Sequence, residues 1–225
     1  MLSQAIGELL PYAVGVALSP IPIIAVILML DTPKARTNGP AFALGWIVGL
    51  TAAALIVLLI SGGSSDPDST ASDSVSWAQL AIGFVFLAMA RRQWSSRPKD
   101  GAAPTMPKWM ATIDQVTPVK ALGLGVLLSG INPKNLALAA AAGAALAQAG
   151  LDAGGDALGI AVFVVLGSVT VVGAVVFYVI APRAAAGPLA SIKTFMSEHN
   201  SVIMMVILLL LGAKLIGSGL GVLGS

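Results

Sequence analysis

Six apolar runs follow one another along this chain of 225 residues, with short polar segments between them. The runs cover residues 6–30, 40–61, 75–90, 119–149, 158–181 and 202–223. A transmembrane helix needs about 20 mostly apolar residues, so the third run is short and the fourth is long. Only 10% of the residues are charged and the mean hydropathy is +0.93, which is typical of multi-pass membrane proteins. The sequence therefore predicts an all-α integral membrane protein with six transmembrane helices.

The composition leaves little material for enzyme chemistry. The chain has no cysteine and a single histidine, His199, which excludes disulfides, thiolate metal sites and clusters of several histidines. It contains no GxxxxGK[ST] phosphate-binding loop. We therefore expect no enzyme activity, no catalytic residue, no metal and no cofactor. A net charge of +2 is too small to indicate a nucleic-acid partner. The first run carries Glu8 and no basic segment precedes it, so we expect a first span and not a cleaved signal.

The basic residues fall on one side of the predicted topology. With six spans, the segments after the first, third and fifth spans share a side. They hold ten of the twelve basic residues: Lys34, Arg36, Arg91, Arg92, Arg97, Lys99, Lys108, Lys120, Arg183 and Lys193. The opposite side holds none and carries Glu8, Asp66, Asp68, Asp73, Asp152 and Asp156. Short loops rich in Lys and Arg stay cytoplasmic. We expect a protein of the cytoplasmic membrane with both termini outside, and with 91–119 and 182–201, including His199, as cytoplasmic loops.

The fourth run is interrupted by INPKNLALA (131–139), which places Asn132, Pro133, Lys134 and Asn135 among apolar residues. A proline inside a helix removes a backbone hydrogen bond. In lipid such a break persists only where protein or a water-filled cavity satisfies the freed groups. Lysine at the bilayer centre costs about 2.5–3.5 kcal/mol on insertion scales, and such a residue is a functional candidate. This stretch therefore predicts the wall of a membrane transport site.

The first run has a matching interruption. LSPIPIIAV (18–26) places Ser19 before Pro20 and Pro22. Each interruption lies in the first span of a three-span half, and an odd number of spans inverts the second half. Pro20 lies 14 residues from Ile6, and Lys134 lies 14 residues from Lys120. At 1.5 Å per residue, both would be about 21 Å deep, from opposite faces. We therefore predict two inverted three-helix repeats with broken helices 1 and 4, a recurring plan of transporters.

Lys134 and Lys214 are the only basic residues inside the predicted spans, and no acidic residue lies at their depth. Such lysines snorkel to the surface, lose their proton or meet an anion supplied by a substrate. Snorkelling is the simpler alternative for Lys214. Our hypothesis is that both lysines form a cationic patch that receives an anionic headgroup or carboxylate. Asn132, Asn135 and Ser19 could bind a polar substrate, or satisfy carbonyls freed by the prolines.

The chain divides into a first repeat (1–95), a basic cytoplasmic linker (96–118) and a second repeat (119–225). Within the linker, PKWMATIDQV (107–116) spaces Trp109, Met110 and Ile113 as on a helix. This segment could lie in the lipid headgroup layer. A solvated linker with a few anchoring side chains is the alternative.

The stretches ALSPIPIIAVILMLDTPKARTNGPAFALGWIVGL (17–50) and PKWMATIDQVTPVKALGLGVLLSGINPKNLALA (107–139) resemble the glycolipid-addressing protein family of actinobacteria. That family includes the sulfolipid-addressing protein and belongs to the lysine exporter superfamily. The resemblance implies a six-span exporter-like fold and movement of a glycolipid or lipid precursor toward the cell surface. It carries family motif positions over to Ser19, Pro20, Pro22, Asn132, Pro133, Lys134 and Asn135; Lys214 rests on burial alone.

Three functions stay open from the sequence. The first is a transporter of an anionic or amphipathic glycolipid or lipid precursor, with the bilayer as its surroundings and a homodimer as one possible assembly. The second is an exporter of a small solute such as an amino acid. The third is a membrane scaffold that docks lipid-synthesis or export proteins through its basic cytoplasmic loop.

Overall fold

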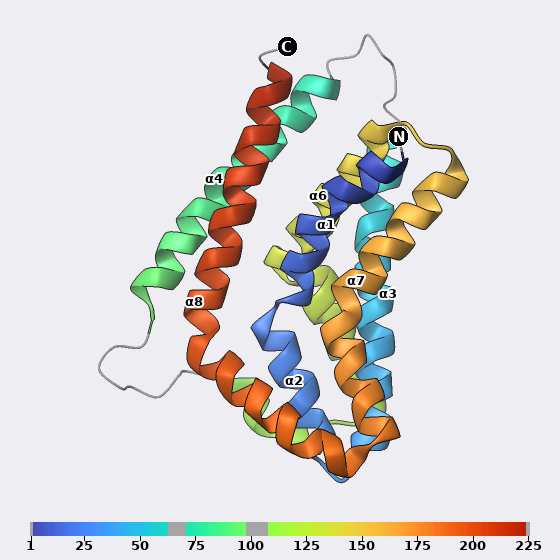
Figure 1. Cartoon of the computed structure of the whole chain (residues 1–225), viewed down its shortest axis with the longest axis vertical. Helices are drawn as coiled ribbons and strands as arrows, with labels where there is room; N and C mark the ends of the chain where they lie inside the picture. The colour runs from blue at the N-terminus through green and yellow to red at the C-terminus, as the bar shows by residue number, and fades with distance from the viewer. Residues whose placement is uncertain (1, 63–70, 98–107, 224–225) are drawn as a thin grey trace.

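The computed structural model describes residues 2–62, 71–97 and 108–223, and every element among them is helical (Figure 1). The elements in chain order are α1 (Leu2–Ala17), α2 (Pro20–Leu30), α3 (Ala35–Gly62), α4 (Ala71–Ser95), the 3₁₀ helix η1 (Lys108–Gln115), α5 (Pro118–Val126), the π-helical turn η2 (Leu127–Ile131), α6 (Pro133–Ala149), α7 (Ala153–Ile180) and α8 (Pro182–Leu223).

Three of these helices are long and apolar enough to cross a membrane: Ala35–Ser61, Ala153–Ile180 and Pro182–Leu220. A fourth span results if α1 and α2, bent by 51° at their junction, count as one. Large apolar side chains such as Leu59, Val165 and Leu210 are exposed on these helices, as expected for surfaces that face lipid and not water. The predicted all-α membrane protein is thereby confirmed in its class.

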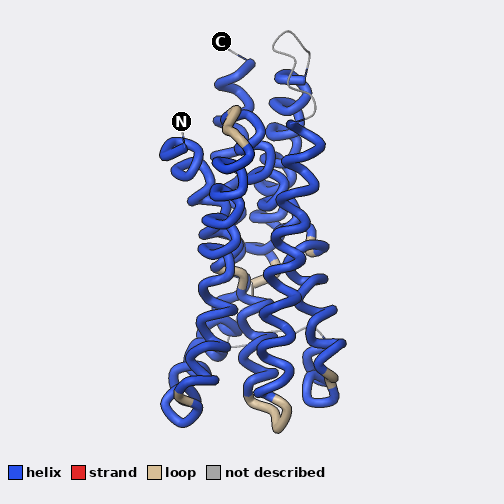
Figure 2. The backbone as a smooth tube through the Cα atoms, turned by 90° about the vertical axis from the view of Figure 1, so that its right-hand side faces the viewer, coloured by secondary structure: helices blue, strands red, loops and turns tan. Residues whose placement is uncertain are grey.

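The helices run roughly along one long axis, and both termini lie at the same end of the molecule (Figures 1 and 2). Most packing joins the two halves of the chain: α3 packs on α5 and α6, α7 packs on α1, and α4 packs on α8. The two predicted repeats therefore share one core. The division of the chain at 95 and 118 remains a prediction, and residues 98–107 of the linker lie outside the described residues.

Glycines allow α3 and α5 to approach backbone to backbone. A Cβ atom added to Gly45 would lie 2.0 Å from the carbonyl oxygen of Leu122, and one added to Gly125 would lie 2.3 Å from that of Phe42. Small residues at helix contacts are the usual means of close packing in membranes. This glycine contact fixes α5 and the turn that follows it.

The predicted loop conformation over 182–201 is wrong, because this segment is the first part of α8; its cytoplasmic side stays a prediction. We call residues 182–201 the α8 arm; Figure 1 shows α8 changing direction between the arm and the rest of the helix. Ala185 and Leu189 of the arm are buried one helical turn apart, while Arg183 is exposed. His199 is accordingly helical and exposed, and its ring stacks on Phe195.

The segment 107–116, described from Lys108 on, is packed and is not a solvated linker, while its place in the lipid headgroup layer stays a prediction. Met110, Ile113 and Val116 are buried, and η1 packs against α2. Asn38 of α3, itself fully buried, donates from Nδ2 to the carbonyl oxygen of Val116 at 2.8 Å. The segment is thus a packed part of the protein that leads into α5. The side chain of Trp109, and the charged residues Asp66, Asp68 and Lys99, lie outside the described part of the chain.

Candidate functional site

The first helix break lies between α1 and α2, where prolines remove hydrogen-bond donors. Pro20 and Pro22 have no N–H group, so α1 cannot continue through them. The amide of Ser19 turns back to the carbonyl oxygen of Val16 at 3.1 Å. The carbonyl of Gly15, which Ser19 would reach in an unbroken helix, therefore needs another donor. Pro20 is the first residue of the new helix α2, a position that proline favours.

The second break lies between η2 and α6. The amide of Asn132 reaches the carbonyl oxygen of Leu127 at 2.9 Å, which widens the last turn before Pro133 opens α6. The carbonyl of Leu128 is capped by Nδ2 of Asn135 at 2.8 Å, so the expected role of Asn135 toward a freed carbonyl is confirmed. Asn132 differs: its Oδ1 accepts from the amide of Lys134 at 3.1 Å. It caps the start of α6 and does not satisfy a carbonyl.

The two breaks meet through side chains. Nζ of Lys134 donates to the carbonyl oxygen of Gly15 at 2.8 Å and to Oγ of Ser19. Oγ of Ser19 in turn donates to Oδ1 of Asn135 at 3.0 Å. Ser19 therefore bonds across to the other broken helix and does not cap its own, contrary to its expected local role. We call Ser19, Lys134 and Asn135, with the Gly15 carbonyl, the Lys134 cluster.

The Lys134 cluster holds a buried lysine without an anionic partner among the described residues. Lys134 is 4% exposed, and no carboxylate in residues 2–62, 71–97 and 108–223 pairs with it. Its contact with Gly15 lies in the last turn of α1, where the carbonyl ends of the helix attract positive charge. Buried charge is costly unless it is paired. The cluster supplies dipoles in place of an ion pair, so an anion would find an unclaimed positive charge there.

The prolines of the motif shape the backbone and offer no polar atom to a ligand. Pro20 and Pro22 are buried in the first turn of α2, and Pro133 is exposed at the first position of α6. They hold the two breaks in place, which sets the positions of Ser19 and Lys134.

Lys214 lies apart from the Lys134 cluster. Its Nζ donates to the carbonyl oxygen of Glu8 at 3.1 Å and lies 4.0 Å from the centre of the Tyr12 ring. Glu8 and Gly15, the two α1 carbonyls that the lysines contact, are separated by about 10.5 Å at 1.5 Å per residue. The structure therefore does not join the lysines in one patch. Lys214 is only partly buried and points toward the N-terminal end of α1, as the snorkelling alternative expects.

Two further polar side chains, both on α7, were not predicted from the sequence. Oγ1 of Thr170 in α7 donates to the carbonyl oxygen of Ala17 at 2.7 Å, and so satisfies a second carbonyl of the first break. Ser168, two residues before Thr170 on α7, is buried and its hydroxyl has no hydrogen-bond partner among the described residues. The sequence signal for both was GSVT (167–170), which places two hydroxyl side chains within an apolar span.

A cavity opens at the far end of the seam between α1 and α6. It has a volume of about 300 Å³ and is lined by Gln4, Ala5, Glu8, Ala145, Gln148 and Ala149. Gly15 and Lys134 lie deeper on the same two helices. The cavity and the Lys134 cluster thus lie toward opposite ends of the contact between α1 and α6.

Comparison with known proteins supports the sequence resemblance. The family model described as Sap, sulfolipid-1-addressing protein, matches residues 9–221. No curated protein and no solved structure matches the chain. Since the matched region contains both helix breaks and nearly the whole described fold, the chain belongs to the sulfolipid-1-addressing protein family.

Proposed function

We propose that this protein is a transporter that moves an anionic, amphipathic lipid, such as a glycolipid or its precursor, from the cytoplasmic membrane toward the cell surface. The observation that carries the proposal is Lys134, a buried cation at the meeting point of two broken helices with no carboxylate beside it in the described chain. Membership in a family named for addressing a sulfolipid supports a lipid cargo with a negative charge.

In this proposal the chain crosses the membrane six times as two inverted repeats. The packing of α3 with α5, of α7 with α1 and of α4 with α8 supports two equivalent halves. The second helix of each half packs on the first, broken helix of the other half, and the third helices pack on each other. Both termini lie at one end (Figure 1), which supports an even number of crossings. The basic segments favour the cytoplasm for the opposite end, so the termini would face outside.

The anionic group of the cargo would bind at the Lys134 cluster. A lysine ammonium has three N–H donors, two of which bond to Gly15 and Ser19. A sulfate, phosphate or carboxylate would compete for these donors and would gain a charge-assisted hydrogen bond. Because Lys134 is buried in this structure, binding requires one half to rock against the other, as in other inverted-repeat transporters. The apolar part of the cargo would stay in lipid.

The test is a mass-spectrometric comparison of lipids in a deletion strain, its parent and complemented strains. We expect one surface-extractable lipid to disappear in the deletion strain while its cell-associated precursor accumulates. Wild-type protein and a variant with Arg91→Glu and Arg92→Glu, exposed residues at the end of α4, should both restore the surface lipid. Failure of that charge-reversed variant alone would favour the scaffold function. Unchanged lipids with retention of a small solute would favour the solute exporter.

A further inference from the structure

The α8 arm covers the end of the molecule opposite the termini (Figure 1). It contacts α2, the half-helix that begins beside the Lys134 cluster. Ala185 and Leu189 of the arm face inward and are buried, whereas Ile192 and Phe195 are 42% and 53% exposed. An arm with a buried apolar side and exposed large apolar residues borders lipid as well as protein.

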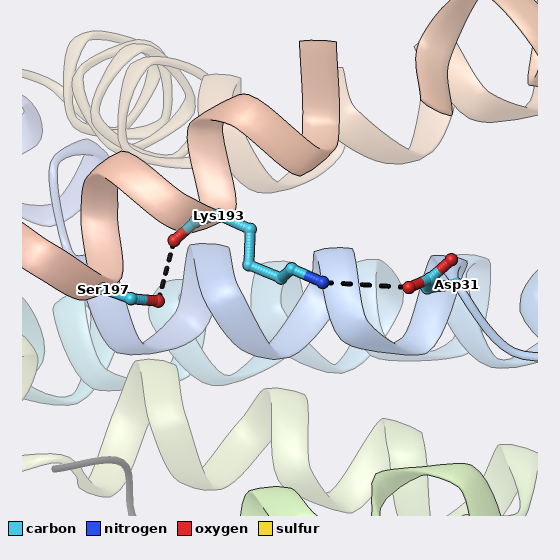
Figure 3. Close-up of polar contacts among 3 residues, drawn as sticks. All are labelled: Asp31, Lys193 and Ser197. Atoms are coloured by element: carbon cyan, nitrogen blue, oxygen red, sulfur yellow. Dashed lines mark hydrogen bonds and ion pairs between the residues drawn. The ribbon is translucent and has the colours of Figure 1, made fainter. Parts of the chain in front are cut away.

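One ion pair joins the arm to α2. Nζ of Lys193 lies 3.7 Å from Oδ2 of Asp31 (Figure 3), and it is the only ion pair formed among residues 2–62, 71–97 and 108–223. Asp31 caps the C-terminus of α2, where its amide contacts the carbonyl of Ile27. The hydroxyl of Ser197 donates to the Lys193 carbonyl at 2.7 Å on the arm itself (Figure 3). The ion pair thus links the end of α2 to one turn of the arm.

Behind the ion pair lies a small cavity between three helices. It has a volume of about 60 Å³ and is lined by Ile27, Leu30, Asp31, Tyr178, Ala186, Leu189, Ala190 and Lys193. The walls are mainly aliphatic and the two charges belong to the ion pair. This pattern matches an amphiphile, with an acyl chain inside and a charged headgroup at Lys193. The present volume is far below the roughly 300–1,000 Å³ of a small-molecule site, so the cavity must widen before it can take an acyl chain.

We propose that this cavity is the closed entrance for the acyl chain of the cargo from the cytoplasmic leaflet, and that the Asp31–Lys193 ion pair is its latch. The inference rests on the proposed lipid transport. When the arm moves away from α2, the cavity opens toward the bilayer next to Ile192 and Phe195. An entrance at this place admits an amphiphile laterally, without passage of its chain through water.

The latch is connected to the Lys134 cluster by a single rigid element. α2 has 11 residues and is about 16 Å long at 1.5 Å per residue. Ser19 precedes its first residue and Asp31 follows its last. Because Ser19 bonds to Lys134 and Asn135, a shift of α2 after the latch opens would disturb those bonds. Entry of the cargo would in this way be coupled to release of Lys134 for the anionic group.

The chain has no cysteine, so a single Leu189→Cys variant reports on the cavity directly. Leu189 is 5% exposed, and we expect slow reaction with a small maleimide in the purified full-length protein in amphipol. Adding Asp31→Asn should speed labelling by up to about fivefold, the shift that corresponds to an exposed ion pair. The matched control is Arg183→Gln, which removes another charge from the arm and should leave the rate unchanged. The exchanged pair, Asp31→Lys with Lys193→Asp, should restore slow labelling.

The latch proposal is overturned if Asp31→Asn leaves the labelling rate unchanged, or if the exchanged pair does not restore slow labelling. The occupant is tested in the Asp31→Asn background with decyl phosphate and with inorganic phosphate as competitors. Protection by decyl phosphate alone supports an acyl entrance; protection by phosphate alone, or by neither, overturns it. The labelling experiments use purified protein and need no transport. Their outcome is therefore independent of the lipid comparison that tests the proposed function. A working latch in a protein whose deletion changes no lipid would refute the transport proposal and leave the latch standing.

Discussion

Gly125→Ala is the perturbation that best tests the contact between α3 and α5. The added methyl group would lie 2.3 Å from the carbonyl oxygen of Phe42 and 2.7 Å from the amide nitrogen of Trp46. Both are backbone atoms within a helix and cannot rotate away. Ordinary contact begins at 3.4 Å, so α5 must move by about 1 Å from α3 to accommodate the methyl group.

Overpacking of this kind typically costs about 1–3 kcal/mol. Alanine instead of glycine favours a helix by about 0.8–1.0 kcal/mol, which offsets part of that cost. Gly123→Ala on the same helix is the matched control, because a Cβ atom there meets nothing within 4 Å. It gains the same helix propensity without the clash. The two variants should therefore differ by about 1–3 kcal/mol, with Gly125→Ala the less stable.

The assay is thermal unfolding of both variants in the same detergent, followed by circular dichroism. A difference of about 1–3 kcal/mol corresponds to about 2–12 °C in Tm for a chain of this size. We expect Gly123→Ala to unfold at or slightly above the wild-type temperature and Gly125→Ala to unfold below it. Equal melting temperatures for the two variants would refute the close approach of α3 and α5, and with it the position of the second helix break.

Two further predictions concern contacts at the breaks. Thr170→Val keeps the side-chain shape but removes the hydrogen bond to the Ala17 carbonyl. It should lower stability by about 0.6 kcal/mol, the average for such bonds between membrane helices, and by at most about 1.7 kcal/mol. Thr37→Val, whose exposed hydroxyl bonds within its own turn, should change stability little, and an equal loss in both variants would contradict the interpretation. Lys214→Met should preserve surface lipid in the complementation assay, since Lys214 lies outside the Lys134 cluster; loss of that lipid with normal protein levels would return Lys214 to the site.

The sequence was informative where a residue costs free energy in its surroundings, as a proline does within a helix or a lysine within an apolar span. Pro20 and Pro133 predicted the two helix breaks. The two breaks were predicted at equal depth from opposite faces of the membrane, which indicated that they would meet. Lys134 was the strongest candidate for a site residue, because an ionisable side chain inside a membrane span is costly and usually has a function. All three inferences used only distance along the chain, and the contact of Lys134 with Ser19 matches them.

What the sequence lacked was the direction in which side chains point around each helix. Lys134 and Lys214 both lie inside predicted spans, yet they contact α1 about two turns apart. The α8 arm was predicted as a loop because it lies between two apolar runs, although its residues Ala185 and Leu189 are buried one helical turn apart. The glycine contact was also out of reach, because the order of residues does not tell Gly125 from Gly123. These features depend on tertiary packing between the halves.

The most direct measurement of the central claim is lipid transport by Lys134→Met compared with Lys120→Met. Both lysines lie in the first turn of a helix that begins with proline, but Lys120 is exposed whereas Lys134 is buried in the cluster. Each variant would complement the deletion strain at matched membrane abundance, with the surface lipid quantified by mass spectrometry. Our account predicts that Lys120→Met restores the surface lipid and that Lys134→Met leaves its precursor in the cell. Full restoration by Lys134→Met would contradict the assignment of the Lys134 cluster as the anion site.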